Sequence, residues 1–592
     1  MKTIASIWAV NDGEKIQRED LLNVNKQANS VWDGQRVKLQ SARNEVVAFQ
    51  IVIESGAEGV RGLQVELSEL RHQEDPSCRI ANGEDAFADP NCYLERYIEI
   101  FSEHYINVPP ELTTPPQWFY AENAPPQHKS GWIPDALIPH NARAGFGGQP
   151  IEVLPFCNQG FWVDIYVSDS DAIKPGMYLG EITVSLSGEK VASLIVQLEV
   201  LGFALPHENH SQTMVYASNV DVYFKDLEHP RDALRKMAHR HRFDLIGSDV
   251  HDQPFDKEAL ERYAPYLNGM FYTPENGYEG PGAGVGERIF PIGMYGSPVL
   301  GETEQEMQRE ADKWMGWFEE QEWKGQCFLY LIDEPLPDKF EWINSRSQAI
   351  KSSAGPGKNL PVLTTRPYTE GIEDAIDIWC GSIINAKEKL GADEQGKPTW
   401  FYNGYRPSSG AVILEAAAID LRVNGGWLKW RYDLDNYFLW HSTHWKHNHQ
   451  GPRGRWHQNV YGYPVTFVLY REHTDTHIDD LYYVKGGLYW GNGDGILFYP
   501  GRDPFFMEQD RGINGPISSI RMKNLRRGIQ DYEYMWLAAE RAGKAVVDTI
   551  VQAAIPQGLH EADRGSQATW SSCGSDWDGY RSKLAELIMS GS

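Results

Sequence analysis

The stretch CFLYLIDEP, residues 327–335, is an apolar run that ends in two adjacent acids and a proline. Continuous apolarity from 327 to 332 is typical of a strand buried on both faces, as in a parallel sheet. Pro335 cannot donate to a strand ladder, so it leaves Asp333 and Glu334 at the strand's carboxyl end. The simplest interpretation is a strand followed by a polar loop, and the surrounding fold decides whether these acids carry chemistry.

The chain after residue 205 alternates strand-like and helical runs. A helix is indicated after Gly301, where Thr303 and Glu306 form a capping box ahead of a periodic apolar stripe. About eight strand candidates at this spacing predict a (β/α)8 barrel over residues 206–545, with a doubly wound sheet as the alternative. The clearest strand-like runs are MVYASNVDVYF (214–224), ERIFPIGM (287–294), NLPVLTT (359–365), DIWCGSII (377–384), TWFYN (399–403) and NYFLW (436–440).

The first 205 residues alternate apolar and polar side chains with a period of two. In GEITVSL (180–186), Ile182, Val184 and Leu186 share one face, and SGEK (187–190) then turns the chain into VASLIVQLEV (191–200). Many short strands without intervening helices predict a β-sandwich over residues 1–205. A helix is predicted through Ile529 and Trp536, and residues 546–592 are expected to be a C-terminal extension.

Composition narrows the classes of partner. The 592 residues carry a formal net charge of −27, which disfavours nucleic acid and anionic membranes. No run approaches the roughly 20 apolar residues of a membrane span, and the N-terminal residues are expected to form a strand rather than a signal peptide. We therefore expect a cytoplasmic protein. The six cysteines form no CxxC pair, and no cofactor is expected, whereas the oligomeric state is not indicated.

Two neighbouring acids at a barrel mouth disfavour each other's ionisation, which keeps one of them protonated as a general acid. Glycoside hydrolysis needs such a group. In a conventional pair the two carboxyls face each other across the sugar, about 5–10 Å apart, which consecutive residues cannot readily do. Asp333 and Glu334 can work together when the substrate's own 2-acetamido oxygen is the nucleophile.

Several stretches resemble one family along most of the chain. They are SARNEVVAFQIVI, GWIPDALIPH, FWVDIYVSDSDAIKPGMYLGEITV, YLIDEP, TWFYNGYRP, LDNYFLWHSTHW, GDGILFYPG and GPISSIRMKNLRRGIQDYEY. Together they resemble glycoside hydrolase family 123, the β-N-acetylgalactosaminidase type, and its wider glycoside-hydrolase-like relatives. The resemblance implies that Asp333 orients the acetamido group, that Glu334 is the general acid and base, and that configuration is retained through an oxazoline-like intermediate.

Six further residues are candidates for sugar contact, each with a structural alternative. An acetamido pocket needs an apolar wall and a hydroxyl donor, which Trp400 and Tyr402 could supply if they do not pack in the core. Trp440 could form the floor beneath the sugar ring, and Trp379 is a similar but more buried candidate. Asp494 lies among glycines and could hold hydroxyls or start a turn, and Arg366 could contact substrate or pair with an acid.

The run HSTHWKHNH places His441, His444, His447 and His449 at spacings that could bind a metal. It lacks an HExxH motif, so we expect no metal and interpret it as an exposed loop, with sugar contact by one histidine as an alternative. Two rival functions stay open. One is a glycosidase of the same fold for a sugar without an acetamido group, with Asp494 examined first as nucleophile, and the other is a non-catalytic carbohydrate-binding protein.

Overall fold

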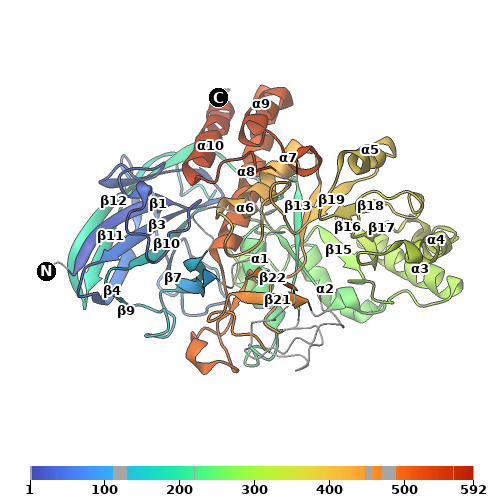
Figure 1. The fold of residues 1–592 in the computed structure, drawn as a ribbon, viewed down its shortest axis with the longest axis horizontal. Helices are drawn as coiled ribbons and strands as arrows, with labels where there is room; N and C mark the ends of the chain where they lie inside the picture. Colours follow the sequence, from blue (N-terminus) through green and yellow to red (C-terminus); the bar gives the residue numbers. More distant parts are fainter. Residues whose placement is uncertain are drawn as a thin grey trace.

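The computed structural model describes residues 3–110, 130–218, 220–247, 249–446, 457–469, 488–563 and 566–590. Its central feature is a sheet of eight parallel strands in the half of the molecule away from the N-terminal sheets (Figure 1). The strands lie in the order β14-β13-β20-β19-β18-β17-β16-β15. Taken around a ring, this is the order of the strands along the chain, with β13 beside both β14 and β20. The strands are β13 (Gln212–Tyr216), β14 (Asp244–Ile246), β15 (Ile289–Ile292), β16 (Gln326–Ile332), β17 (Val362–Thr364), β18 (Ile378–Gly381), β19 (Thr399–Tyr402) and β20 (Asn436–Leu439). This ring order confirms the predicted barrel and excludes the doubly wound sheet.

One seam of the barrel is closed by a side chain. No strand ladder pairs β14 with β15, but the Asp244 carboxylate accepts hydrogen bonds from the backbone N–H groups of Arg288 and Ile289, at 2.8 and 3.0 Å. Burial, together with the nearby charge of Glu287, raises the pKa of Asp244 to about 7. The carboxylate therefore replaces ladder bonds where the ring is nearly closed.

Helices cover the outside of the barrel. Helix α3 begins at the capping box predicted from Thr303 and Glu306, and its Met307, Ala311 and Trp314 are buried against the strands. Residues 365–377, between β17 and β18, contain no helix. The helices are α1 (Pro230–Arg240), α2 (Lys257–Leu267), α3 (Glu304–Glu320), α4 (Phe340–Lys351), α5 (Ala386–Glu394), α6 (Ile419–Arg422), α7 (Leu428–Arg431) and α8 (Ile520–Ala542).

Two β-sheets precede the barrel and share one apolar core. Phe49 and Val163 enter this core from one sheet, and Ile182 and Leu198 enter it from the other. The five-stranded sheet has the order β1 (Ile4–Asn11), β3 (Glu45–Ser55), β10 (Asn158–Val167), β7 (Ile98–Val108) and β8 (Gly131–Pro139). The seven-stranded sheet has the order β2 (Arg36–Arg43), β12 (Glu189–Ala204), β11 (Gly176–Leu186), β4 (Val60–Leu67) and β9 (Ile151–Val153), and β5 (Leu70–His72) and β6 (Arg79–Ile80) join it beside β11.

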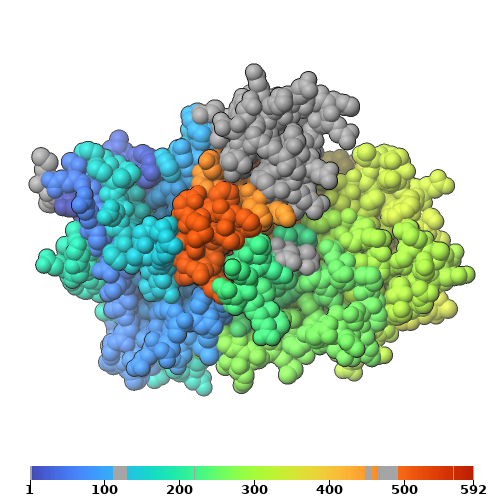
Figure 2. Space-filling model, turned by 90° about the horizontal axis from the view of Figure 1, so that it is seen from below, coloured from blue at the N-terminus to red at the C-terminus, as the bar shows by residue number. Residues whose placement is uncertain are grey.

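The chain between β20 and α8 joins the two halves. It contains the short strands β21 (Val465–Leu469), β22 (Leu488–Asn492), β23 (Tyr499–Pro500) and β24 (Pro516–Ile517). Figure 2 shows the orange segment that follows residue 500 between the blue N-terminal part and the green chain of the barrel. Arg511 donates to the carbonyl of Phe146 at 2.8 Å, and the Phe505 ring meets that of Tyr223. Two further helices, α9 (Lys544–Ala554) and α10 (Gly574–Met589), pack against α8.

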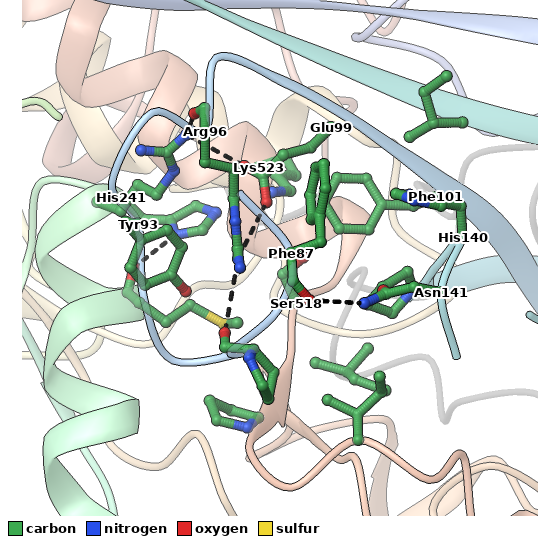
Figure 3. Close-up of a pocket in the computed structure, with 18 residues that line it drawn as sticks. Phe87, Tyr93, Arg96, Glu99, Phe101, His140, Asn141, His241, Ser518 and Lys523 are labelled. Atoms are coloured by element: carbon green, nitrogen blue, oxygen red, sulfur yellow. Dashed lines mark hydrogen bonds and ion pairs between the residues drawn. The ribbon is translucent and has the colours of Figure 1, made fainter. Parts of the chain in front are cut away.

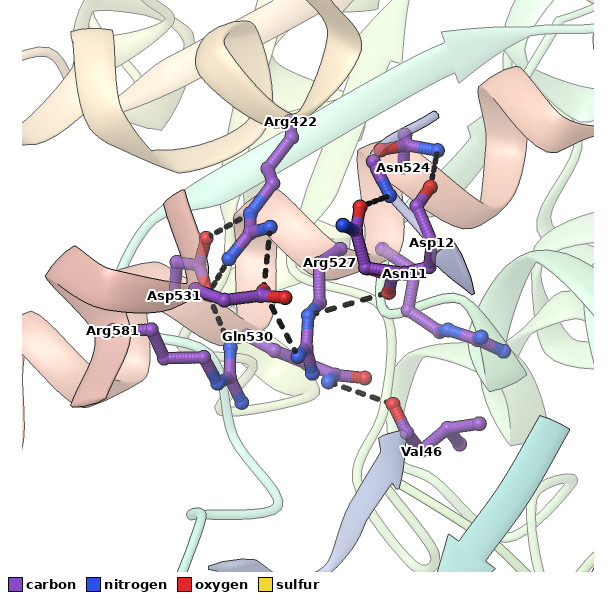
Figure 4. A network of polar contacts seen from close by, with 12 residues as sticks. Asn11, Asp12, Val46, Arg422, Asn524, Arg527, Gln530, Asp531 and Arg581 are labelled. Carbon is purple, nitrogen blue, oxygen red and sulfur yellow. Dashed lines mark hydrogen bonds and ion pairs between the residues drawn. The ribbon is translucent and has the colours of Figure 1, made fainter. Parts of the chain in front are cut away.

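Helix α8 carries a buried network of charges where these parts meet (Figure 4). Asp531 accepts from Arg422 of α6 at 2.6 Å and from the Trp427 indole at 2.8 Å. Arg581 of α10 pairs with both Asp531 and Glu45 of β3. The side chains of Asp531 and Arg422 are 0% exposed, so the charges of this network are compensated by one another and not by water.

We expect Asp531→Asn to lower the free energy of unfolding by about 3–5 kcal/mol, because it leaves two buried guanidinium groups without their shared anion. The midpoint of urea unfolding measures this effect. Asp433→Asn is the control, since the Asp433 side chain is 83% exposed and its nearest cation, Lys544, lies at 3.8 Å. Equal midpoints for the two variants would contradict the structural role of Asp531.

Candidate active site

Asp333 and Glu334 lie directly after β16, at the edge where the carboxyl ends of the barrel strands meet. Both residues are exposed, and neither forms an ion pair with any residue that the structure describes. In barrel enzymes this edge carries the catalytic groups. The position predicted for the two acids therefore agrees with the structure.

The backbone at this edge is strained. Glu334 has φ 40°, and Tyr295 after β15 and Asn403 after β19 have φ 52° and 55°. The pairing of β16 with β17 also shifts register between Tyr330 and Ile332. Left-handed conformations of residues other than glycine persist only where their surroundings enforce them, and they gather at functional sites.

Two hydroxyl groups hold Asp333 through a single oxygen. Tyr330 donates to Oδ1 at 2.8 Å and Thr365 donates to the same atom at 2.7 Å. The Thr365 hydroxyl also accepts from the backbone N–H of Glu334 at 2.7 Å. Among the described residues no hydrogen bond reaches Oδ2 of Asp333, which stays available as an acceptor.

Glu334 has the environment of a general acid. Its carboxylate accepts a hydrogen bond from the hydroxyl of Tyr402, the last residue of β19. Although the side chain is exposed, the surrounding protein partly desolvates the carboxyl and raises the pKa of Glu334. The charge of Asp333 raises this pKa further, whereas the Tyr402 hydrogen bond opposes the shift. The raised pKa keeps the carboxyl protonated to higher pH than an ordinary glutamate.

Trp400 lies deeper than Tyr402 on the same face of β19. It is 0% exposed and packs inside the barrel against Phe328, with ring centroids 5.2 Å apart. Side chains two residues apart on a barrel strand lie in successive layers, so Tyr402 reaches the edge and Trp400 fills the core. The prediction that Trp400 walls an acetamido pocket is therefore corrected to core packing.

Trp440 and Asp494 form a pair at the end of β20. The Trp440 indole donates to Asp494 Oδ1 at 2.9 Å, and the Tyr295 hydroxyl donates to the Trp440 carbonyl. Asp494 is only 2% exposed, and burial raises its pKa to about 6. The half-buried Trp440 thus lies at the edge of the barrel. The hydrogen bond to Asp494 holds its indole ring in place.

The structure does not bring Trp379 to the acids. Trp379 faces the helical layer outside the barrel, is 0% exposed and packs on Tyr368. Arg366 lies close to the acids but is engaged, since it donates to the Pro335 carbonyl and to the Thr369 hydroxyl, the latter at 3.3 Å. Its position is that of a support for the acidic loop, and contact of Arg366 with substrate stays a prediction.

The histidine run is partly buried. His441 and His444 are 3% and 1% exposed and pack edge to face with each other, and the His441 ring also meets that of Tyr216. The interpretation as an exposed loop is wrong for these two residues, and His447 and His449 lie outside the described residues. In the part of the chain that the structure describes, no three His, Cys, Asp or Glu side chains are grouped to hold a metal ion.

A separate cavity of about 40 Å³ lies between the N-terminal sheet, α1 and α8 (Figure 3). Arg96, Glu99, His241 and Lys523 line it together with Phe101. Its volume suits about one water molecule, so it is too small for a sugar. The barrel edge, rather than this cavity, is the candidate active site. Within the described ranges, no helix combines the length and apolarity needed to cross a membrane.

Comparisons with known proteins agree with this geometry. Residues 312–538 match the family model described as Glycoside hydrolase 123, catalytic domain, a range that includes both acids. A family 123 glycoside hydrolase from Clostridium perfringens, whose structure addresses glycolipid glycan hydrolysis, has a TM-score of 0.61 and 14% identity, covering 100% of this chain and 98% of that one. At this identity the likeness shows the fold.

Other matches are more distant. A GH5 xyloglucanase from Bacteroides ovatus has a TM-score of 0.26 and 8% identity, covering 83% of this chain and 98% of its own, which is too low to carry an argument. No curated protein matches the chain. The catalytic-domain match over residues 312–538, a range that contains the acids at the barrel edge, supports glycoside hydrolase activity of the family 123 type.

Proposed function

We propose that this enzyme removes β-linked N-acetylhexosamine, N-acetylgalactosamine in particular, by substrate-assisted catalysis with retention of configuration. The observation that carries the proposal is the pair of adjacent, exposed acids with different surroundings. Asp333 is held by two hydroxyl donors, and Glu334 has a raised pKa. We also propose a sandwich domain over residues 1–205, a catalytic barrel over 206–545 and an extension over 546–592.

The proposed reaction has two steps. In the first, the acetamido oxygen attacks C1 while the Glu334 carboxyl gives its proton to the glycosidic oxygen, so the C1–O bond breaks and an oxazoline-like ring forms. Asp333 Oδ2 accepts from the acetamido N–H and stabilises the positive charge that develops there. In the second, the Glu334 carboxylate takes a proton from water as the water oxygen attacks C1 from the face that the leaving group occupied. The ring C1–O bond breaks at the same time, which restores the 2-acetamido group and releases the sugar.

The alternative is a sugar without an acetamido group, which requires a third carboxylate as nucleophile. Asp494 was the first candidate for that role. It is buried and accepts the Trp440 indole N–H, which makes it a poor nucleophile. A non-catalytic carbohydrate-binding role is disfavoured because it gives no reason to hold two acids side by side beneath a strained backbone.

A panel of chromogenic β-glycosides tests the proposal, with both acetamido epimers and their 2-hydroxy counterparts, and with glycolipid glycans because the Clostridium perfringens relative concerns them. We expect hydrolysis of the acetamido glycosides and a β-anomer as the first product seen by NMR. A thiazoline analogue of the intermediate should inhibit strongly. Faster turnover of the 2-hydroxy glycosides, or initial release of the α-anomer, would refute the mechanism.

Tyr402→Phe should move the alkaline limb of the kcat/KM profile to higher pH. The Tyr402 hydrogen bond favours ionised Glu334, so its loss raises the Glu334 pKa, and the protonated acid then persists to higher pH. Profiles recorded between pH 4 and 9 measure the shift. Tyr368→Phe is the control, because Tyr368 packs on Trp379 outside the barrel. An alkaline limb that moves to lower pH would contradict the assignment of Glu334 as the acid.

A further inference from the structure

We propose that Thr365 is a positioning residue for the reaction, because its hydroxyl ties the backbone of one catalytic acid to the side chain of the other. This inference rests on the proposed function of the acid pair. Thr365 follows β17 and is 3% exposed, so solvent does not compete for its hydroxyl. Neither the barrel pattern nor the family match singles it out.

The direction of both hydrogen bonds is fixed by chemistry. The Glu334 N–H can only donate, so the Thr365 hydroxyl must accept at that contact of 2.7 Å. The single hydroxyl proton then points to Asp333 Oδ1, also at 2.7 Å. One side chain of three heavy atoms beyond Cα therefore sets the distance between the peptide of Glu334 and the carboxylate of Asp333.

The same hydroxyl supports the strained backbone. Glu334 has φ 40°, and its N–H has left the strand ladder, where the register between β16 and β17 shifts. Such a conformation persists when surrounding contacts over-determine it. Thr365 supplies one contact, and Arg366 supplies another by donating to the Pro335 carbonyl. The loop after β17 thus holds the acidic loop from both sides of Glu334.

Asp333 shows why the link affects catalysis. Thr365 and Tyr330 both donate to Oδ1, which fixes rotation of the carboxylate. The second oxygen, Oδ2, remains for the acetamido N–H. Without the Thr365 hydroxyl, Tyr330 alone restrains Oδ1, so the carboxylate can rotate away from the orientation that the first step needs.

A double-mutant cycle tests the link. Thr365→Val, which keeps the shape and removes the hydroxyl, should lower kcat for the best aryl acetamido glycoside by about 10- to 100-fold with little change in KM. Thr365→Ser should recover most of that loss. In an Asp333→Ala background the same Thr365→Val change should cost about tenfold less, because its acceptor is already gone.

Thr364→Val is the matched control. The Thr364 hydroxyl donates to the Ile332 carbonyl at 3.1 Å across the same two strands but touches neither acid. Its cost should be equal in the wild-type and Asp333→Ala backgrounds, and thermal unfolding should show that all variants fold. Equal costs of Thr365→Val in both backgrounds, or no recovery with serine, would overturn the proposal. If the wild-type enzyme cleaves only 2-hydroxy glycosides, the proposed function fails, and the same cycle on that substrate still decides the role of Thr365.

Discussion

Glu334→Gln should lower kcat for an aryl β-N-acetylgalactosaminide by about 10²–10⁴-fold. Glutamine has nearly the same shape but carries no acidic proton, so the leaving oxygen departs unprotonated in the first step and water is not activated in the second. The loss should shrink as the leaving group becomes more acidic, because a stable phenolate needs less protonation. Initial rates with a series of substituted phenyl glycosides measure both effects.

The control for Glu334→Gln is Glu302→Gln. Glu302 is a surface acid whose side chain is 72% exposed and pairs with Arg346. Its replacement should change kcat less than twofold, as is usual for a surface residue outside a functional site. An equal loss for good and poor leaving groups in Glu334→Gln would show that Glu334 acts as something other than the general acid.

Asp333→Asn should lower kcat for acetamido substrates by about 10²–10³-fold, since a neutral amide stabilises the developing positive charge poorly. The substitution also removes a charge that raises the Glu334 pKa. The alkaline limb of the kcat/KM profile should therefore move to lower pH, opposite to the shift expected for Tyr402→Phe. Substrates with and without the acetamido group, compared across pH, measure both effects.

Asp374→Asn, at an exposed position outside the site, is the control for this second variant. It should leave both the rate and the pH profile unchanged. If Asp333→Asn slowed acetamido and 2-hydroxy substrates by the same factor, the carboxylate would act on a group common to both sugars. The contact between Asp333 and the acetamido N–H would then be wrong.

Much of the barrel could be predicted because its strands are short, apolar and regularly spaced. The strand missed by pattern is β14 (Asp244–Ile246), which is only three residues long and follows α1 after a short turn. This strand belongs to the barrel because it pairs in parallel with β13 and because the Asp244 carboxylate binds the backbone at the start of β15. Neither contact leaves a periodic signal in a single sequence.

The site was predictable only in part. Asp333 and Glu334 are recognisable because two acids and a proline directly follow an apolar strand. Trp379 and Trp400 were misassigned because a strand of four residues presents alternate side chains to the barrel interior and to the helices, and the sequence does not say which residue lies at the edge. Thr365 enters the site through the register of β17 against β16, a non-local contact.

The buried charges around helix α8 have a consequence for how the enzyme can be divided. Asp531 shares Arg581 with Glu45, a residue of the first 205, while Arg422 belongs to the barrel. Removing the first 205 residues would take away Glu45 and leave Arg581 with Asp531 at a surface newly exposed to water. We therefore expect residues 206–592, expressed alone, to be less stable than the same residues in the full chain.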